Sequence, residues 1–204
     1  GMGEPLDNYE NLIKAIHVIN SREGMGIGAR KITISTCGIV PGILKLKGLG
    51  LQVELSVSLH AANDALRDEL VPVNRKYPLN ALTSACIEYY ENTGRVITLE
   101  YILLKGKNDS GKDANQLIKI AKRIKARVNL IVYNAGVKGK YERSDAATID
   151  FFESRLRAGR INVTRRRSRG EDISAACGQL AAGGLSEKKR VQTARKKFPE
   201  KREI

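Results

Sequence analysis

Four short runs rich in β-branched residues recur along the chain, and segments with helical periodicity separate them. The runs lie at 31–35, 53–58, 96–104 and 128–133. Strands that alternate with helices form βαβ units, and such units build a parallel sheet or barrel. The sequence therefore predicts an α/β fold in which helices cover parallel strands.

The segments between these runs have the spacing of amphipathic helices. In two of them, apolar residues recur every three or four positions and form one face of a helix. They are Leu12, Ile13, Ile16 and Ile19 in one helix, and Leu79, Leu82, Ala85, Cys86 and Tyr89 in another. A third helix is predicted at 117–124, after a turn and capping cluster at 108–111. A fourth is predicted at 145–156, followed by a basic strand at 161–167 and a short helix or loop of small residues at 174–182.

Length and charge limit the classes of protein that fit. A chain of 204 residues can bury one sizeable core, and a domain of this size removes about 70% of its unfolded surface from water. The net charge is +14, from 36 Lys and Arg against 22 Asp and Glu, and it favours a polyanion such as ribosomal RNA, transfer RNA or DNA. The alternative at this point is a lysine-rich surface that is merely solvated.

The three cysteines, Cys37, Cys86 and Cys177, lie too far apart in the sequence for a local metal knuckle, so no metal ligand is assigned within the chain. An odd number of cysteines also argues against a secreted disulfide framework and favours a reducing compartment. No apolar run reaches the roughly 18 residues of a membrane span, and the glycine-rich, acidic start does not form a signal peptide. We therefore expect a soluble, cytoplasmic protein without a membrane partner.

Polar residues stand at or near the ends of the predicted strands. They are Ser35, then Ser58 and His60, then Glu100 within the third run, and Asn134 after the fourth. Ligands of α/β folds collect at the carboxyl ends of strands, because the loops there supply polar atoms and helix N-termini point at the ligand. One rim of the sheet is therefore a candidate binding site, although each of these residues alone also fits an ordinary turn former.

Two glycine-rich segments lead to different interpretations. The segment 24–28 follows a helix and precedes a strand, which is the wrong order for a phosphate-binding turn, so it is interpreted as a connection. The segment 1–5 precedes a helix and contains Glu4 and Pro5, and proline suits a first helical turn. A carboxylate beside bare backbone can meet the amine or the hydroxyl groups of a small ligand.

The third cysteine has a distinctive setting. Cys177 follows two alanines and precedes a glycine, and four arginines lie nearby in the sequence: Arg165, Arg166, Arg167 and Arg169. Positive charge lowers the pKa of a thiol and favours the nucleophilic thiolate, and a buried structural cysteine is the alternative. Cys86, at an apolar helical position, is assigned to packing, and Cys37 is assigned no role.

Longer stretches of sequence carry a resemblance to a known family. They are 1–5, 33–36, 38–41, 58–61, 63–64, Arg67, Pro72, Asn74, Tyr77, 100–101, 108–109, 129–131, Asn134, 169–170, 172–173 and 175–180. Through them the chain resembles the C-terminal two thirds of the radical-SAM RNA adenine methyltransferases of the RlmN/Cfr type, bacterial enzymes that methylate an adenine of 23S ribosomal RNA. The resemblance covers 1–182 as a partial, N-terminally truncated radical-SAM core and leaves 183–204 as a basic tail.

The resemblance implies an incomplete (βα)6 barrel of the radical-SAM type with a C-terminal basic extension. Such barrels bind S-adenosylmethionine at their strand ends, and the resemblance places Gly3 and Glu4 on its amino group or ribose. The pocket is completed by Ser35, Ser58, Leu59, His60 and Asn134. This set agrees with the rim predicted from the strand ends alone.

The resemblance also implies a mechanism for the intact parent. Cys177 matches the cysteine that carries the transferred methyl group, while a [4Fe-4S] cluster and a second S-adenosylmethionine form the activating radical. The cysteine ligands of the cluster are expected upstream of Gly1, and the cluster needs an electron donor.

The implied reaction is methylation of C2 of an adenine in 23S rRNA, with tRNA left open as a further substrate. The residues expected to bind the RNA are Arg165, Arg166, Arg167 and Arg169. This chain alone is expected to be inactive. The alternative is a noncatalytic RNA-binding or ribosome-associated module derived from the same barrel.

Overall fold

The structure is a computed structural model of the 204-residue chain, and it describes residues 3–134 and 140–166. Within these residues the strands form one sheet in the order β1-β2-β3-β4-β5, and every neighbouring pair is parallel. The strands are β1 (Thr33–Thr36), β2 (Glu54–Ser58), β3 (Thr98–Leu103), β4 (Arg127–Val132) and β5 (Val163–Arg166). The predicted α/β fold with parallel strands is confirmed.

Helices connect the strands, as parallel pairing between consecutive strands requires. They are α1 (Tyr9–Asn20), α2 (Val40–Leu46), α3 (Asp64–Leu70), α4 (Leu79–Thr93), α5 (Gly111–Arg123) and α6 (Ala146–Ala158), with the 3-10 helices η1 (Pro5–Asn8), η2 (Ala29–Lys31) and η3 (Pro72–Arg75). Polar side chains fix several helix starts. Ser110 and Asp113 form a capping box at α5, and the Asp145 carboxylate accepts a hydrogen bond from the Thr148 N–H (2.8 Å) at α6.

The predicted and observed elements differ at a few places. α5 begins at Gly111 rather than at Leu117, because its first turns are polar and are stabilised by the capping box instead of an apolar face. The sequence does not predict α2 and α3, since each has only seven residues, too few for a clear apolar repeat. The segment 24–28 connects α1 to η2, as predicted. The stretch 174–182 and the tail 183–204 lie outside the described residues, so their predicted states stay predictions.

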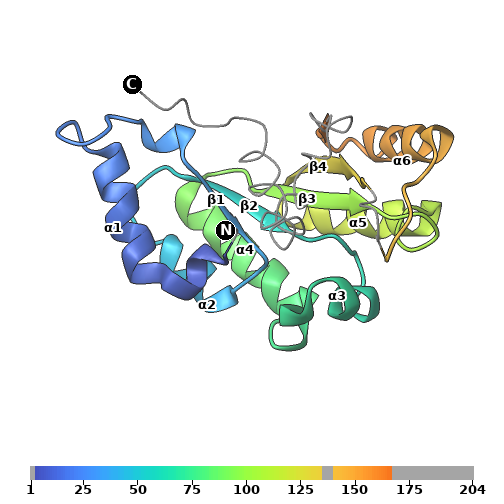
Figure 1. Ribbon diagram of the computed structural model, residues 1–204, viewed down its shortest axis with the longest axis horizontal. Helices are drawn as coiled ribbons and strands as arrows, with labels where there is room; N and C mark the ends of the chain where they lie inside the picture. The colour runs from blue at the N-terminus through green and yellow to red at the C-terminus, as the bar shows by residue number, and fades with distance from the viewer. Residues whose placement is uncertain (1–2, 135–139, 167–204) are drawn as a thin grey trace, which may run out of the picture.

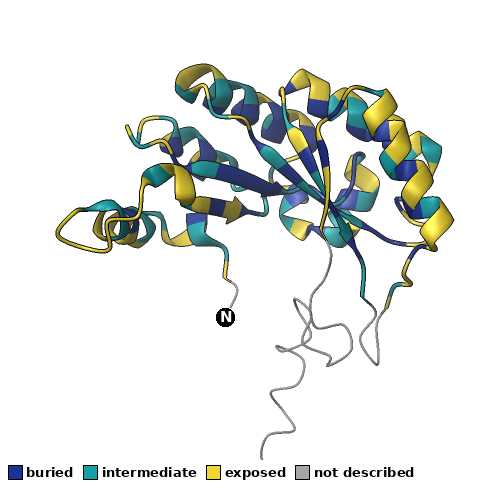
Figure 2. Cartoon of the chain, turned by 90° about the horizontal axis from the view of Figure 1, so that it is seen from above, coloured by how far each residue is buried: buried dark blue, intermediate teal, exposed yellow. Residues whose placement is uncertain are grey.

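One face of the sheet is covered by helices (Figures 1 and 2). α2 packs on α4, α4 on α5 and α5 on α6, so the four helices follow one another along this face. In β3 the side chains of Leu99, Tyr101 and Leu103 are buried, while the residues between them are half-buried. The Tyr101 ring stacks on Phe152 of α6 with centroids 5.5 Å apart, and Cys86 of α4 is buried in the same core, as its helical position predicted.

Parallel pairing brings the carboxyl ends of all five strands to one edge of the sheet. The face that the helices leave open carries polar side chains from neighbouring strands, namely Ser35, Ser56, Ser58, Glu100 and Asn129. The fold thus gives the candidate site two components, a rim of strand ends and a polar sheet surface beside it. Within 3–134 and 140–166, no helix is long and apolar enough to cross a membrane.

Candidate functional site

Glu4 is held at the carboxyl end of β1 by two backbone N–H groups. Its Oε2 accepts a hydrogen bond from the Cys37 N–H (2.7 Å), and its Oε1 accepts one from the Leu6 N–H (3.0 Å) at the start of η1. η1 packs closely on α2 because Gly42 has no side chain; a Cβ at Gly42 would lie 2.8 Å from the Leu6 Cβ. Gly3 is exposed, with open space where a side chain would start. The segment therefore brings a carboxylate and accessible backbone to the rim.

The last two residues of β1 face opposite sides of the sheet. Ser35 is exposed on the open face, whereas Thr36 is buried. The Thr36 Oγ1 accepts hydrogen bonds from the N–H groups of Gly38 (3.0 Å) and Ile39 (3.4 Å), and these bonds turn the chain into α2. Of the two, Ser35 is placed to meet a ligand and Thr36 shapes the turn.

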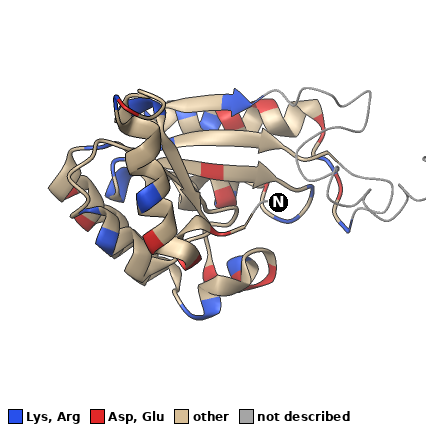
Figure 3. Ribbon diagram, turned by 60° about the vertical axis from the view of Figure 1, so that its left-hand side comes forward, with Lys and Arg blue, Asp and Glu red and all other residues tan. Residues whose placement is uncertain are grey.

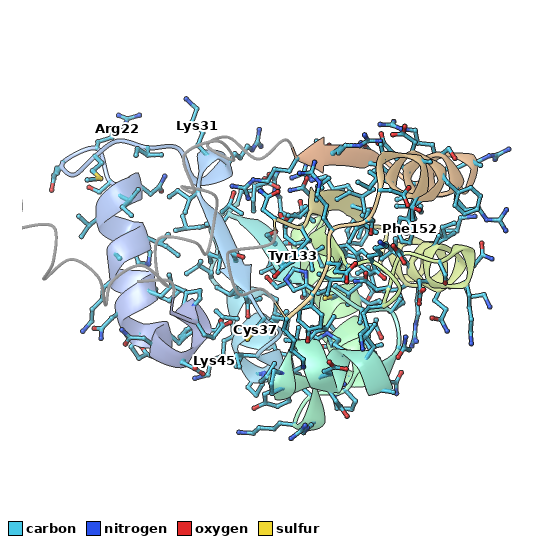
Figure 4. All side chains as sticks on the ribbon, turned by 45° about the vertical axis from the view of Figure 1, so that its right-hand side comes forward. Arg22, Lys31, Cys37, Lys45, Tyr133 and Phe152 are labelled. Atoms are coloured by element: carbon cyan, nitrogen blue, oxygen red, sulfur yellow. The ribbon has the colours of Figure 1, made fainter. Side chains whose placement is uncertain are left out.

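Cys37 directly follows β1 (Figure 4). Burial, together with the Glu4 carboxylate beside it, raises the pKa of the Cys37 thiol to about 12, and burial raises the pKa of Cys86 to about 12 as well. Both thiols are therefore protonated at neutral pH. Among the described residues, no three His, Cys, Asp or Glu side chains gather as a metal site, so these residues offer no ligand set for an iron–sulfur cluster. Cys177 lies outside the described residues.

His60 occupies a left-handed backbone conformation just after β2, with φ 58°. Its Nδ1 accepts a hydrogen bond from the Ile102 N–H (3.3 Å), and its carbonyl accepts one from the Asn108 side chain (2.7 Å). Burial, with a smaller contribution from the Arg67 charge, lowers the pKa of His60 to about 4. The imidazole is therefore neutral at pH 7, and because Nδ1 is the acceptor, the proton is assigned to Nε2.

Ser58 and Leu59 complete the end of β2. The Ser58 side chain lies on the open face and is half-buried, while the Leu59 side chain is buried in the core. The N–H groups of Leu59 and His60 both donate to the Glu100 carbonyl (3.0 and 3.2 Å). Leu59 thus contributes to the rim through its backbone, which fixes the spacing between Ser58 and His60.

Asn134 follows β4 at the same edge and is half-buried. Its Oδ1 accepts a hydrogen bond from the Arg143 Nη1 (3.4 Å), and Arg143 forms an antiparallel bridge with Leu104 beyond the end of β3. Next to Asn134, the Tyr133 ring meets the Tyr141 ring edge-on with centroids 6.4 Å apart. These contacts hold Asn134 close to the end of β3.

Glu100 lies in the middle of β3 on the open face rather than at a strand end. Its carboxylate accepts hydrogen bonds from the Ser56 hydroxyl (3.0 Å) and the Asn129 side chain (2.8 Å), so three neighbouring strands share one polar cluster. The sequence contains a signal for this position, because the alternation of β3 places Glu100 opposite Leu99 and Tyr101. The partners of Glu100 come from β2 and β4, which the sequence alone does not align.

Two of the four predicted RNA-binding arginines, Arg165 and Arg166, lie within the described residues. Arg165 is paired with Asp150 (2.5 Å) and with Glu153 (2.7 Å) of α6. Figure 3 shows a basic strand end beside a helix that carries acidic segments. Arg166 is exposed and, by strand alternation, points to the opposite side of β5. Arg167 and Arg169 lie outside the described residues.

Comparison with known proteins finds several similar chains. No protein-family model matches the chain. The chain is 48% identical over 180 residues to the probable dual-specificity RNA methyltransferase RlmN of Akkermansia muciniphila, an alignment that covers 88% of this chain and 50% of that protein. The corresponding protein of Clostridium novyi is 47% identical, with 88% of this chain and 52% of that protein covered.

A solved structure shows the same relationship. The radical-SAM methyltransferase from Sphaerobacter thermophilus superposes with a TM-score of 0.84 and 47% identity, over 88% of this chain and 52% of that one. The match confirms the radical-SAM partial barrel, and the chain spans about half the length of the relatives it matches. By sequence and by fold, the chain is similar to radical-SAM methyltransferases of the RlmN type over about half of their length.

Proposed function

We propose that this chain is the S-adenosylmethionine-binding part of an enzyme that methylates C2 of an adenine in 23S ribosomal RNA. The observation that carries the proposal is the row of polar groups along the strand ends of a chain 48% identical to an RlmN: Glu4, Ser58, His60 and Asn134. Transfer RNA is a second proposed substrate, because the relatives are described as dual-specificity RNA methyltransferases.

The chemistry of the rim suits a ligand that carries both an amine and hydroxyl groups. Glu4 presents a carboxylate whose position is fixed by two N–H donors, and a carboxylate is a strong acceptor for an ammonium group. His60, neutral with its proton on Nε2, offers a donor, and the Ser58 hydroxyl can donate or accept. When bound, S-adenosylmethionine supplies the methyl group that is transferred and the radical that activates it. Cys177 is proposed as the carrier of that methyl group.

Titration of S-adenosylmethionine into the chain tests the binding part of this proposal. We expect saturable binding by calorimetry, and we expect Glu4→Gln to weaken it about tenfold. The side chain that faces the ligand's ammonium group then loses its negative charge, while one acceptor oxygen remains. Glu23→Gln is the matched control, because Glu23 is exposed in the connection after α1. Equal affinities for the wild-type chain and Glu4→Gln would contradict the assignment of Glu4.

We further propose that the basic end of the described chain binds RNA through phosphates. If about five phosphates are neutralised, log K should fall against log salt with a slope of roughly −4. We expect Arg166→Ala to flatten the slope by about one unit and Arg165→Ala to change it less, because two carboxylates already hold the Arg165 guanidinium. Filter binding to an rRNA fragment at several salt concentrations measures both. A slope near zero would mean that the arginines are ordinary solvated surface.

RNA binding without any S-adenosylmethionine binding would instead favour the noncatalytic module, the alternative that the net charge of +14 supports. The cytoplasmic location, the electron donor and the [4Fe-4S] cluster are proposed for the whole protein from the family resemblance of the sequence. The roles proposed for the residues at the rim do not depend on the cluster.

A further inference from the structure

Arg67 of α3 forms hydrogen bonds with the backbone at the ends of both β1 and β2. Its side chain is 0% exposed, so its N–H groups need partners within the protein. The Nη2 donates to the Cys37 carbonyl (2.7 Å) and at longer range to the Ser58 carbonyl (3.4 Å), and the Nε donates to the Leu59 carbonyl (3.2 Å). One guanidinium therefore bonds to the backbone at both strand ends that carry candidate ligand-binding residues.

The remaining contact of Arg67 is oriented by two carboxylates. The Nη1 donates to the Asn74 Oδ1 (2.8 Å). The Asn74 amide nitrogen donates to Asp64 (2.9 Å) and Asp68 (2.7 Å), which fixes the direction of the amide and turns its oxygen toward Arg67. Asp64 and Asp68 also attract the guanidinium electrostatically. Its hydrogen bonds, however, go to the Asn74 oxygen and to backbone carbonyls at the strand ends.

The chain also keeps space for the guanidinium. Gly38 has φ 111°, a conformation that side chains rarely adopt, and a Cβ there would lie 3.1 Å from the Arg67 Nη2 and 3.3 Å from a Leu82 methyl group. The turn between β1 and α2 is therefore shaped around the buried cation. Cys37, next to Gly38, is held from two sides, since its N–H donates to Glu4 and its carbonyl accepts from Arg67.

We propose that Arg67 is a positioning residue of the S-adenosylmethionine site, which fixes the ends of β1 and β2 so that Glu4, Ser58 and His60 meet one ligand. The inference rests on the proposed function and deepens it. Arg67 itself is buried and touches no ligand. It acts through the peptide group of Cys37, which holds Glu4, and through the carbonyls of Ser58 and Leu59, which set the chain that leads to His60.

The charge of Arg67 affects the pKa of His60, an effect that a purely packing role would not have. The guanidinium adds to the effect of burial in lowering the pKa of His60, so it favours the neutral ring whose Nδ1 accepts from Ile102. A substitution that removes the charge should therefore move the His60 titration. A substitution that only loosens the core elsewhere should not.

Arg67→Met and Arg67→Lys, compared with the wild-type chain, test the proposal. Methionine keeps length and removes both charge and donors, while lysine keeps the charge and loses the fork that reaches several carbonyls. We expect Arg67→Met to speed hydrogen exchange of the Cys37 and Leu59 amides at least about tenfold relative to amides of α5. It should also raise the NMR titration midpoint of His60 by about one pH unit and weaken S-adenosylmethionine binding about tenfold or more.

Arg67→Lys separates the two parts of the role. It should reproduce the faster exchange and weaker binding but leave the His60 midpoint near that of the wild type, because the charge remains. If Arg67→Met does not fold, Arg67→Lys decides the proposal through exchange and affinity. Leu156→Val is the matched control, since Leu156 is buried on α6, which packs on α5 and β5, and it should leave all three measurements unchanged.

These measurements distinguish failure of the positioning role of Arg67 from failure of the proposed S-adenosylmethionine binding. A wild-type chain that binds no S-adenosylmethionine contradicts the proposed function, and exchange at Cys37 and Leu59 then still decides whether Arg67 fixes the strand ends. If the wild type binds and the Arg67 variants bind equally well, or if exchange rises uniformly through the domain, Arg67 is a general stabilising residue and the positioning role is wrong.

Discussion

Substitution of Cys177 by alanine is expected to abolish methyl transfer to RNA by the full-length protein. The proposed mechanism requires a sulfur atom that accepts the methyl group before the RNA is touched, and alanine has none. Alanine fits the local sequence, because Ala175, Ala176 and Gly178 surround the position, so the fold and S-adenosylmethionine binding should persist. With methyl-deuterated S-adenosylmethionine, peptide mass spectrometry should find the label on the wild-type peptide that contains Cys177.

The other cysteines provide the control for this prediction. Cys86 is 1% exposed in the core, so Cys86→Ala should retain methyl transfer and lose about 1 to 3 kcal/mol of unfolding free energy. Cys37 is held as a thiol by burial and by Glu4, so Cys37→Ser should also retain activity. Labelled methyl groups on RNA in the Cys177→Ala variant, or their absence from Cys177 in the wild type, would remove the carrier role.

The parallel fold was accessible from the sequence because its signals are local. Polar residues stand at or near the end of each strand run. The order of the strands in the sheet is also their order in the chain, so the topology needs no long-range rearrangement. The rim followed from the same logic, since parallel strands place their carboxyl ends together. The sequence therefore predicts Ser58, His60 and Asn134 near one edge of the sheet, and they follow or end β2 and β4 there.

The interactions that organise the rim were not accessible in the same way. Arg67 lies on a short helix and bonds to carbonyls of Cys37 and Leu59, 30 and 8 positions away, and backbone acceptors leave no trace in the sequence. For Arg165 the sequence is misleading in a different way. Its charge predicts an RNA contact, whereas in the fold its guanidinium binds two carboxylates of α6. In both cases the sequence gives the charge of the residue, but only the three-dimensional structure identifies the groups that it binds.

A drop in pH is expected to destabilise the chain through His60. Its pKa is about 4 in the folded protein, whereas an unfolded histidine titrates near 6.5. Below about pH 6.5 the unfolded chain takes up a proton that the folded chain does not, so unfolding becomes more favourable as the pH falls. The loss should begin near pH 6.5, reach about 3 kcal/mol near pH 4 and level off below it, because both states are then protonated.

Urea denaturation between pH 4 and pH 7.5 measures this effect when the wild type is compared with His60→Asn. Asparagine tolerates the left-handed backbone at φ 58° and can still accept from the Ile102 N–H, so the variant keeps the local geometry and loses the titrating group. Other groups titrate in both proteins and cancel in the difference. The stability difference between wild type and His60→Asn should therefore shrink or reverse as the pH falls. Identical pH profiles for the wild type and His60→Asn would contradict the lowered pKa of His60.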